Sequence, residues 1–369
     1  MTNKADRVMS LDVFRGLTVA GMILVNNPGD WGHVYAPLLH AKWHGCTPTD
    51  LVFPFFLFIV GVSISFSMWG VKDKPEKHGA VLKKVIIRSL KLIGIGLFLS
   101  GFPYFNLETL RLPGVLQRIG IVFFFAGFIF LKTSWKAQLQ GLVVILLTYW
   151  AVMTLIPVPG VGTPNLDDPN MTIAGWFDNF LLEGHMWSQS KTWDPEGLLS
   201  TLPAIGTGLI GVLTGTWIRT EKDEKEKVAW MFVAGVILVV LGSWWDYFFP
   251  INKSLWTSSY VLYAGGMGVI GLAFSYWLID VKKIGRKVTF PFLVFGINPM
   301  FAFVLSGLLV KILIAIKIGD TSLRSLEYDI LYKSWLDGTA ASFAHAVGFV
   351  LLMYLPTWWL YKKNIILKV

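Results

Sequence analysis

The chain has 369 residues, of which 54% are hydrophobic and only 15% are charged, and its formal net charge is +9. A soluble domain carries about 25% charged residues, so this composition excludes an ordinary soluble enzyme and favours an integral membrane protein. The one cysteine, Cys46, excludes a disulfide within the chain.

Apolar residues recur in ten blocks of about 20 residues, the length of helix that crosses the core of a bilayer. Because backbone polar groups in lipid must be satisfied within the segment, each block is predicted to form a helix. The expected fold is all-α and membrane-integral, a bundle of about ten transmembrane helices. The predicted spans are 11–27, 50–69, 85–103, 114–131, 138–156, 198–218, 228–249, 256–279, 290–316 and 340–361.

The Lys and Arg residues predict how these spans are oriented. With the N-terminus in the cytoplasm, 23 of the 32 basic residues fall in inner segments and only nine in outer ones. This excess follows the positive-inside rule. An even number of spans also returns the basic C-terminal tail, with Lys362, Lys363 and Lys368, to the same side. Both termini are therefore expected in the cytoplasm.

Two long segments lie on the outer side in this topology. Segment 28–49 is rich in His and Trp, and segment 157–197 is rich in Pro, Gly and acidic residues. Long loops in compact proteins often carry function. No linker separates the spans, so the whole chain, 1–369, is predicted to be a single transmembrane domain with these two outer loops.

Half of the six histidines lie in the first outer loop, which makes it the leading candidate for a catalytic site. They are His33, His40 and His44. An imidazole titrates near neutral pH and serves as base, acid or nucleophile. Asn26 closes the first span, where its amide can hold an oxyanion. The alternative to a catalytic site is a set of polar loop residues at the boundary with the lipid headgroups.

His40 and His44 have the i, i+4 spacing of metal ligands, but Gly45 opposes a continuous helix, so no metal is expected.

The cytoplasmic entry to the first span is a second candidate. Ser10 can cap the helix that begins at Leu11. Asp12 and Arg15 are three residues apart and can pair on one face, which describes a self-paired helix start. The functional alternative is an anion contact at the inner face, made by Arg15.

Five polar residues fall inside predicted spans, where polar groups are costly and therefore point inward. They are Gln117, Arg118, Asp246, Asn298 and His345. Each alone is explained by hydrogen bonds between helices; together they indicate a polar interior. The Asn298–Pro299 pair is expected to break its helix and to free carbonyl groups inside a protein-lined cavity.

The second outer loop ends in a run of aromatic and acidic residues. Asp194 and Glu196 lie beside Trp193, and Trp43 lies in the first outer loop. Carboxylates and aromatic rings at the outer end of a transmembrane span suit binding of a sugar or an amine. The alternative for the carboxylates is a helix cap, with Asp194 before Pro195 and Glu196 in the first turn.

Eight stretches, in order over nearly the whole chain, resemble the heparan-alpha-glucosaminide N-acetyltransferase family and its bacterial relatives. The stretches are Ser10-Leu-Asp-Val-Phe-Arg-Gly, Asn26, His40-Ala-Lys-Trp-His-Gly, Asp50-Leu-Val-Phe-Pro, Pro113-Gly-Val-Leu-Gln-Arg, Asp194-Pro-Glu-Gly-Leu, Asn252-Lys-Ser-Leu-Trp and Gly296-Ile-Asn-Pro. The extra lumenal domain and additional first span of the lysosomal enzyme are not found in this sequence, which fits a bacterial, inner-membrane member.

The resemblance implies an N-acetyltransferase that moves acetyl from cytosolic acetyl-CoA to the amine of a glucosamine-type sugar on the periplasmic side. His40 matches the family's active-site histidine and Asn26 the asparagine beside it, whereas His44 matches an asparagine and is not carried over. Asp194, Glu196, Trp43 and Asn298 are predicted to bind the sugar. The resemblance also implies a homodimer.

Acetyl-CoA is the implied co-substrate, and its phosphates need cations, which the inner face supplies. Arg15, Gln117 and Arg118 are predicted to contact it. The alternative function is an inner-membrane aminosugar transporter, since some bacterial relatives are named as transporters. Binding of CoA separates the two, because a sugar carrier has no reason to bind it.

Overall fold

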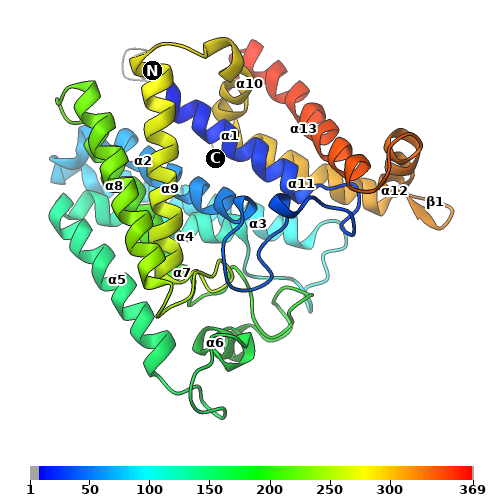
Figure 1. Cartoon of the computed structure of the whole chain (residues 1–369), viewed down its shortest axis with the longest axis horizontal. Helices are drawn as coiled ribbons and strands as arrows, with labels where there is room; N and C mark the ends of the chain where they lie inside the picture. Colours follow the sequence, from blue (N-terminus) through cyan, green and yellow to red (C-terminus); the bar gives the residue numbers. More distant parts are fainter. Residues whose placement is uncertain (1–7, 368–369) are drawn as a thin grey trace. The chain divides into compact units, whose positions relative to one another are not determined.

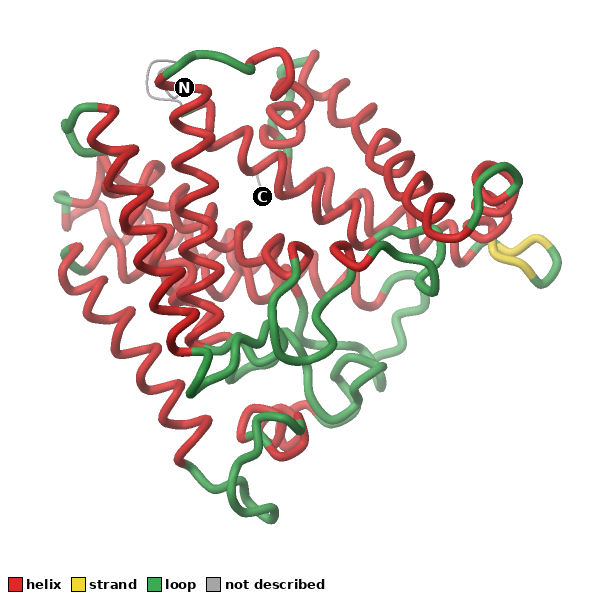
Figure 2. Tube along the Cα trace, in the orientation of Figure 1, coloured by secondary structure: helices red, strands yellow, loops and turns green. Residues whose placement is uncertain are grey.

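Residues 8–367 of the chain are described by a computed structural model, in which helices joined by loops account for nearly all of the structure (Figures 1 and 2). Lys4, Arg7 and Lys368, which contribute to the predicted orientation, lie outside the described residues. The chain divides into two compact units. Unit 1 comprises Met1–His40, Thr47–Phe53 and Gly271–Val369, and unit 2 comprises Ala41–Cys46 and Pro54–Ile270.

Both units are built from helices, and the letter η marks short 3-10 or π-helical turns. Unit 1 contains α1 (Met9–Asn26), η2 (Ala36–Leu38), η4 (Trp277–Val281), α10 (Arg286–Ile297), α11 (Pro299–Ala315), β1 (Lys317–Ile318), β2 (Thr321–Ser322), α12 (Leu323–Tyr328), η5 (Asp329–Lys333) and α13 (Gly338–Lys362). Unit 2 contains α3 (Pro75–Gly101), α4 (Val115–Lys132), α5 (Trp135–Leu155), η3 (Pro169–Met171), α6 (Ile173–Leu182), α7 (Thr201–Ile218) and α8 (Glu224–Trp245). Helices α2 (Pro48–Lys72) and α9 (Ser258–Tyr276) each run from one unit into the other.

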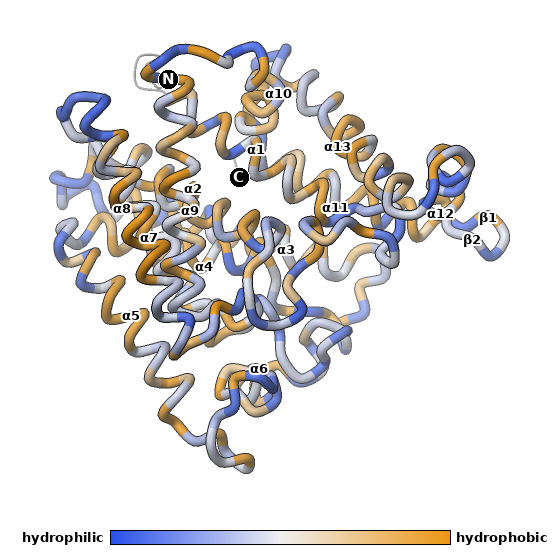
Figure 3. The backbone as a smooth tube through the Cα atoms, in the orientation of Figure 1, coloured by the Kyte–Doolittle hydropathy of each residue, from blue (hydrophilic) through white to orange (hydrophobic). Residues whose placement is uncertain are grey.

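The predicted all-α membrane fold is confirmed by these helices. Among the described residues, eight helices are long and apolar enough to cross a membrane, and the bent pair α10 and α11 makes a ninth candidate. Figure 3 shows apolar residues running along α8, below a hydrophilic loop. The predicted span 85–103 lies in α3, which is not among the eight and carries Lys83, Lys84, Arg88 and Lys91 in its middle turns. The number of ten spans and the orientation remain predictions.

In unit 1, α1 and α10 lie in direct backbone contact. A Cβ atom on Gly16 would lie 1.6 Å from the carbonyl oxygen of Phe292, and one on Gly296 would lie 1.8 Å from that of Asp12. The carboxylate of Asp280 accepts hydrogen bonds from the free N–H groups of Met9 and Ser10, at 3.2 and 3.0 Å. These contacts fix the first helix against its neighbours.

The expected break at Asn298–Pro299 is present. Helices α10 and α11 meet there at an angle of 76°. Proline has no N–H to donate and its ring clashes with the preceding turn, so the helix changes direction at this point. The Asn298 amide fills the break by donating to Ile365 O and accepting from Leu367 N, both at 2.9 Å.

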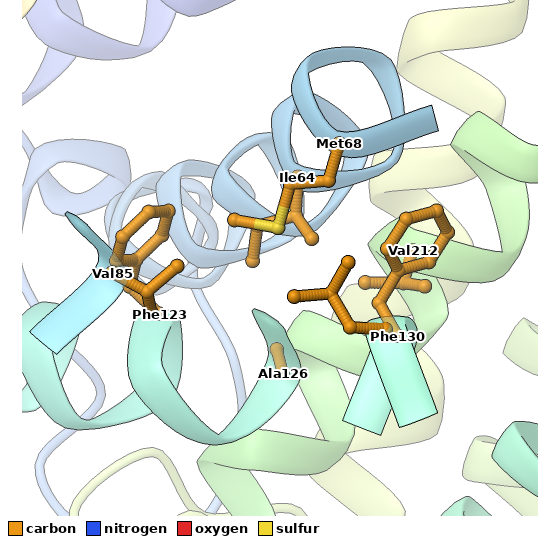
Figure 4. Close-up of a cluster of buried hydrophobic side chains, with 8 residues drawn as sticks. Ile64, Met68, Val85, Phe123, Ala126, Phe130 and Val212 are labelled. Carbon is orange, nitrogen blue, oxygen red and sulfur yellow. The ribbon is translucent and has the colours of Figure 1, made fainter. Parts of the chain in front are cut away.

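Unit 2 has an apolar core formed by α2, α3, α4 and α7. Figure 4 shows this cluster, whose buried members are Ile64, Met68, Val85, Phe123, Ala126, Phe130, Leu131 and Val212. Helices α2 and α7 approach closely because glycines face each other, and a Cβ on Gly61 would lie 2.0 Å from the carbonyl oxygen of Gly208. The core therefore anchors α4, whose first turn carries Gln117 and Arg118.

Candidate active site

His40 and Asp50 form a hydrogen-bonded pair in unit 1. His40 Nδ1 lies 2.7 Å from Asp50 Oδ1, although ten residues separate them in the chain. The Asp50 side chain is 1% exposed and that of His40 is 46% exposed. A buried carboxylate thus lies behind an imidazole that faces outward.

The first turn of α2 explains why Asp50 is held in place. Thr47 precedes the helix, and Asp50 reaches back so that its Oδ2 accepts hydrogen bonds from Thr47 N and Oγ1, both at 3.0 Å. This is one half of a capping box, in which the acidic residue three positions after the cap accepts from the backbone N–H of the cap residue. Thr47 Oγ1 also lies 2.7 Å from Leu39 O, which ties the cap to the residue before His40.

The pair determines which nitrogen of His40 can do chemistry. An ionised carboxylate only accepts hydrogen bonds, so Nδ1 carries the proton that is donated to Asp50. In a neutral imidazole the lone pair is then on Nε2. A carboxylate behind Nδ1 also stabilises the positive charge that forms when Nε2 takes a proton. The arrangement suits a general base or a nucleophile.

Asn26 is the last residue of α1 and is exposed. The residues that follow it are tied down from α12 and α13. His345, buried in α13, donates from Nδ1 to Asn27 O at 3.2 Å and pairs through Nε2 with Glu327 at 3.1 Å. Arg324 donates to Pro28 O at 2.9 Å. Asn26 therefore stands at the end of a fixed helix, and its role stays a prediction.

His33 also pairs with a carboxylate in the first outer loop. Its Nδ1 lies 2.7 Å from Asp30 Oδ2, but both side chains are largely exposed, at 57% and 43%. A hydrogen bond to His33 lowers the pKa of Asp30, aided by the Gly32 N–H. This pair resembles the His40 pair in distance and differs from it in burial.

His44, in unit 2, is held from two sides. Asn252 Nδ2–H donates to His44 Nδ1 at 3.3 Å, and His44 Nε2–H donates to Asp167 Oδ1 at 2.9 Å. Trp43 beside it donates from Nε1 to Leu166 O at 2.7 Å.

Among the described residues there is no group of three or more His, Cys, Asp or Glu that would hold a metal ion.

Asp194 and Glu196 lie in a buried ion-pair network of unit 2. Arg111 donates to both oxygens of Asp194, at 2.8 and 2.6 Å, and to Glu196 at 2.5 Å. Burial opposes the charged forms, but the hydrogen bonds and mutual attraction outweigh it. They raise the pKa of Arg111 and lower that of Glu196. The predicted contact with a substrate ammonium stays a prediction, since these carboxylates bind Arg111 in the structure.

Asp178 on α6 adds a third carboxylate to this network. It accepts hydrogen bonds from Leu198 N at 2.9 Å and Asp194 N at 3.4 Å. Burial raises the pKa of Asp178 to about 6. Asp178 thus links α6 to the residues before α7, while Asp194 and Glu196 link the end of the second outer loop to Arg111, between α3 and α4.

Replacing Arg111 with Ala should strongly destabilise the protein, because two buried carboxylates would lose their cation. Breaking a buried pair in this way costs about 3 kcal/mol or more. In detergent, the midpoint of thermal unfolding should fall by several degrees for Arg111→Ala and by less for Arg111→Lys. Lys42→Ala, which removes an exposed charge of the same unit, is the control. Equal midpoints for Arg111→Ala and Lys42→Ala would contradict the assigned role.

The residues predicted to contact acetyl-CoA are engaged within the protein. Arg118 is 1% exposed, donates to Gly197 O at 3.0 Å and Ser200 Oγ at 2.5 Å, and lies over the Trp256 ring. Gln117 donates to Leu112 O at 3.1 Å. Their role in binding the co-substrate remains a prediction.

The pair predicted at the start of the first helix is present in the structure, but the helix begins at Met9 and its cap position is Val8, so Ser10 is not the cap. Arg15 Nη1 donates to Asp12 Oδ1 at 3.1 Å and to Gly296 O at 3.2 Å. The guanidinium thus links α1 to the end of α10, next to the break at Asn298. The predicted contact of Arg15 with an anion at the inner face stays a prediction.

Three contributors were not singled out from the sequence. In the sequence, Asp50 stands within a motif, Arg111 is one of nine outer basic residues, and Asp167 is one of several acids in the second outer loop. The spacing Thr47-x-x-Asp50 was an available signal for a capped helix and a buried carboxylate. No local signal joins Arg111 to Asp194, since 83 residues separate them.

Comparison with known proteins gives one family and two curated relatives. The family description is heparan-alpha-glucosaminide N-acetyltransferase, catalytic, and the match covers residues 7–251. The chain is 31% identical over 357 residues to heparan-alpha-glucosaminide N-acetyltransferase from Mus musculus, covering 82% of this chain and 53% of the relative. It is also 31% identical over 353 residues to the Homo sapiens protein of that name, covering 81% and 52%. The chain thus spans about half the length of these relatives.

Proposed function

Because the chain belongs to the heparan-alpha-glucosaminide N-acetyltransferase family, we propose that it is a transmembrane N-acetyltransferase using acetyl-CoA. The acetyl group of cytosolic acetyl-CoA is moved to the amine of a glucosamine-type sugar on the periplasmic side of a bacterial inner membrane. The observation that carries this proposal is the His40–Asp50 pair, which lies within the residues that match the family. The proposal includes a homodimer.

His40 performs the proton or acyl transfer at Nε2. As a general base, it removes a proton from the acceptor ammonium, and the neutral amine attacks the thioester carbonyl; the carbon–sulfur bond breaks, and the thiolate of CoA leaves with the proton that the imidazolium returns. As a nucleophile, it attacks that carbonyl itself, the carbon–sulfur bond breaks, and the thiolate of CoA leaves. The amine then takes the acetyl group from the imidazole. Both routes need the lone pair on Nε2 that the Asp50 hydrogen bond selects.

Asp50 and Asn26 support this chemistry in different ways. Asp50 holds the tautomer and stabilises the imidazolium that forms during proton transfer. Asn26 is proposed to donate from its amide to the carbonyl oxygen, where negative charge develops. Cations at the inner face, Arg15 among them, are proposed to attract the phosphates of CoA.

The test is acetyl transfer by the purified protein in liposomes. Labelled acetyl-CoA is offered with glucosamine, and the expected product is sugar labelled at its amine. Binding of CoA is measured separately by calorimetry. Absence of both transfer and CoA binding, together with glucosamine uptake into the liposomes, would overturn the proposal in favour of an aminosugar carrier.

A further inference from the structure

Unit 2 presents an exposed carboxylate beside an oriented imidazole and three tryptophans. The Asp167 side chain is 82% exposed, and its Oδ1 accepts the His44 Nε2–H. Trp43 packs edge-on against Trp193, with ring centroids 5.2 Å apart. Trp193 in turn packs edge-on against Trp187 at 6.4 Å. All three rings are half-buried.

This arrangement is built outward from buried groups. Asn252, which is 0% exposed, orients His44, and the Gly45 N–H donates to Ile251 O at 2.7 Å. The backbone of residues 44–46 is therefore held beside residues 251–252. The His44 ring is fixed in orientation, since its two nitrogens have different partners.

The tryptophan-bearing loop is fixed by the ion-pair network below it. Asp194, whose carboxylate binds Arg111, accepts a hydrogen bond from Trp187 N at 2.9 Å. Thr192 donates to Asn170 at 2.5 Å, which joins this loop to the segment that carries Asp167. Rings and carboxylate therefore belong to one preorganised surface.

We propose that Asp167, His44, Trp43 and Trp193 form the subsite that binds the protonated aminosugar acceptor. This inference rests on the proposed function and names the residues that choose its substrate. A hexosamine has an apolar C–H face that packs on indole rings, a ring of hydroxyls that hydrogen-bond to imidazole and carboxylate, and one ammonium. The ammonium is attracted by the Asp167 carboxylate and by the faces of the tryptophans.

Two features favour Asp167 over the other acids of the loop as the ammonium partner. Asp194 and Glu196 already bind Arg111. Asp168 is committed to the turn that follows, because its Oδ1 accepts from Asn170 N and Nδ2.

The experiment compares Asp167→Asn with Asp168→Asn, a matched loss of charge at the next residue. The Asn side chain keeps an oxygen to accept from His44 in the first variant and from Asn170 N in the second. Asp167→Asn is expected to raise KM for glucosamine about tenfold, whereas Asp168→Asn stays within about twofold of the wild type. Inhibition by N-acetylglucosamine, which has no ammonium, should be the same in both variants.

Calorimetric titration with glucosamine, in the absence of acetyl-CoA, separates failure of the subsite from failure of the proposed function. If the wild type transfers acetyl and Asp167→Asn keeps the wild-type KM, the subsite is wrong and the acetyltransferase stands. If glucosamine binds to the wild type and ten times more weakly to Asp167→Asn, but no acetyl is transferred, the subsite is supported and the proposed acetyltransferase function is wrong. Equal loss of glucosamine and N-acetylglucosamine binding would reduce Asp167 to a structural residue and overturn the proposal.

Discussion

Replacing His40 with alanine is expected to lower acetyl transfer to glucosamine by about a thousandfold. The variant has neither the base nor the nucleophile, and proton transfer by a positioned side chain alone contributes a factor of about a hundred to ten thousand. His40 lies in a loop and is half-exposed, so the variant should fold and should still bind CoA. Transfer is measured with labelled acetyl-CoA, and CoA binding by calorimetry on the same preparation.

The matched control for this variant is His33→Ala. His33 lies in the same outer loop and has the same 2.7 Å contact from Nδ1 to a carboxylate, but its partner is exposed. It should retain transfer within about twofold of the wild type. Wild-type turnover by His40→Ala would remove His40 from the mechanism, and an equal loss in both variants would point to a general effect on the loop.

Replacing Asp50 with asparagine is expected to lower transfer by about a hundredfold or more. An amide can present N–H to His40, which places the imidazole proton on the wrong nitrogen and removes the charge that stabilises the imidazolium. The effect should fall on kcat rather than on KM for either substrate. Rates at saturating acetyl-CoA and glucosamine measure it directly.

Two controls separate this effect from a loss of structure. Asp30→Asn changes the exposed histidine-bound carboxylate of the same loop and should leave transfer within about twofold of the wild type. Thr47→Val removes the hydroxyl that contacts Asp50 and Leu39 O, and so tests the loop and helix cap without changing Asp50. If Thr47→Val loses as much activity as Asp50→Asn, then Asp50 acts by holding the loop and not by orienting His40.

The sequence predicted the class of fold because length and polarity decide which segments cross a bilayer. It was less informative for α3, where an apolar block beginning at 85 shares one continuous helix with basic residues. The break at Asn298–Pro299 was predictable from proline chemistry, whereas its angle of 76° depends on packing around it. Local chemistry thus indicated the positions of elements, and tertiary contacts determined their geometry.

The candidate site was predicted in part. His40 stood out because few residues titrate near neutral pH and three of the six histidines share one loop. Its partner Asp50 could not be predicted in this way, since the contact depends on how the chain turns back between the two residues. The ion pairs of Arg111 could not be predicted for the same reason, since its two carboxylate partners lie more than 80 residues later in the chain. Such contacts follow from topology, which local patterns do not encode.

The measurement that tests the central claim most directly is a double-mutant cycle on His40 and Asp50. If Asp50 acts only through His40, the two changes are not additive, and His40→Ala with Asp50→Asn transfers acetyl as slowly as His40→Ala alone. Single-turnover transfer from labelled acetyl-CoA gives the four rates. A further fall of about a hundredfold in the double variant would contradict this mechanism, because Asp50 would then contribute independently of the histidine it contacts.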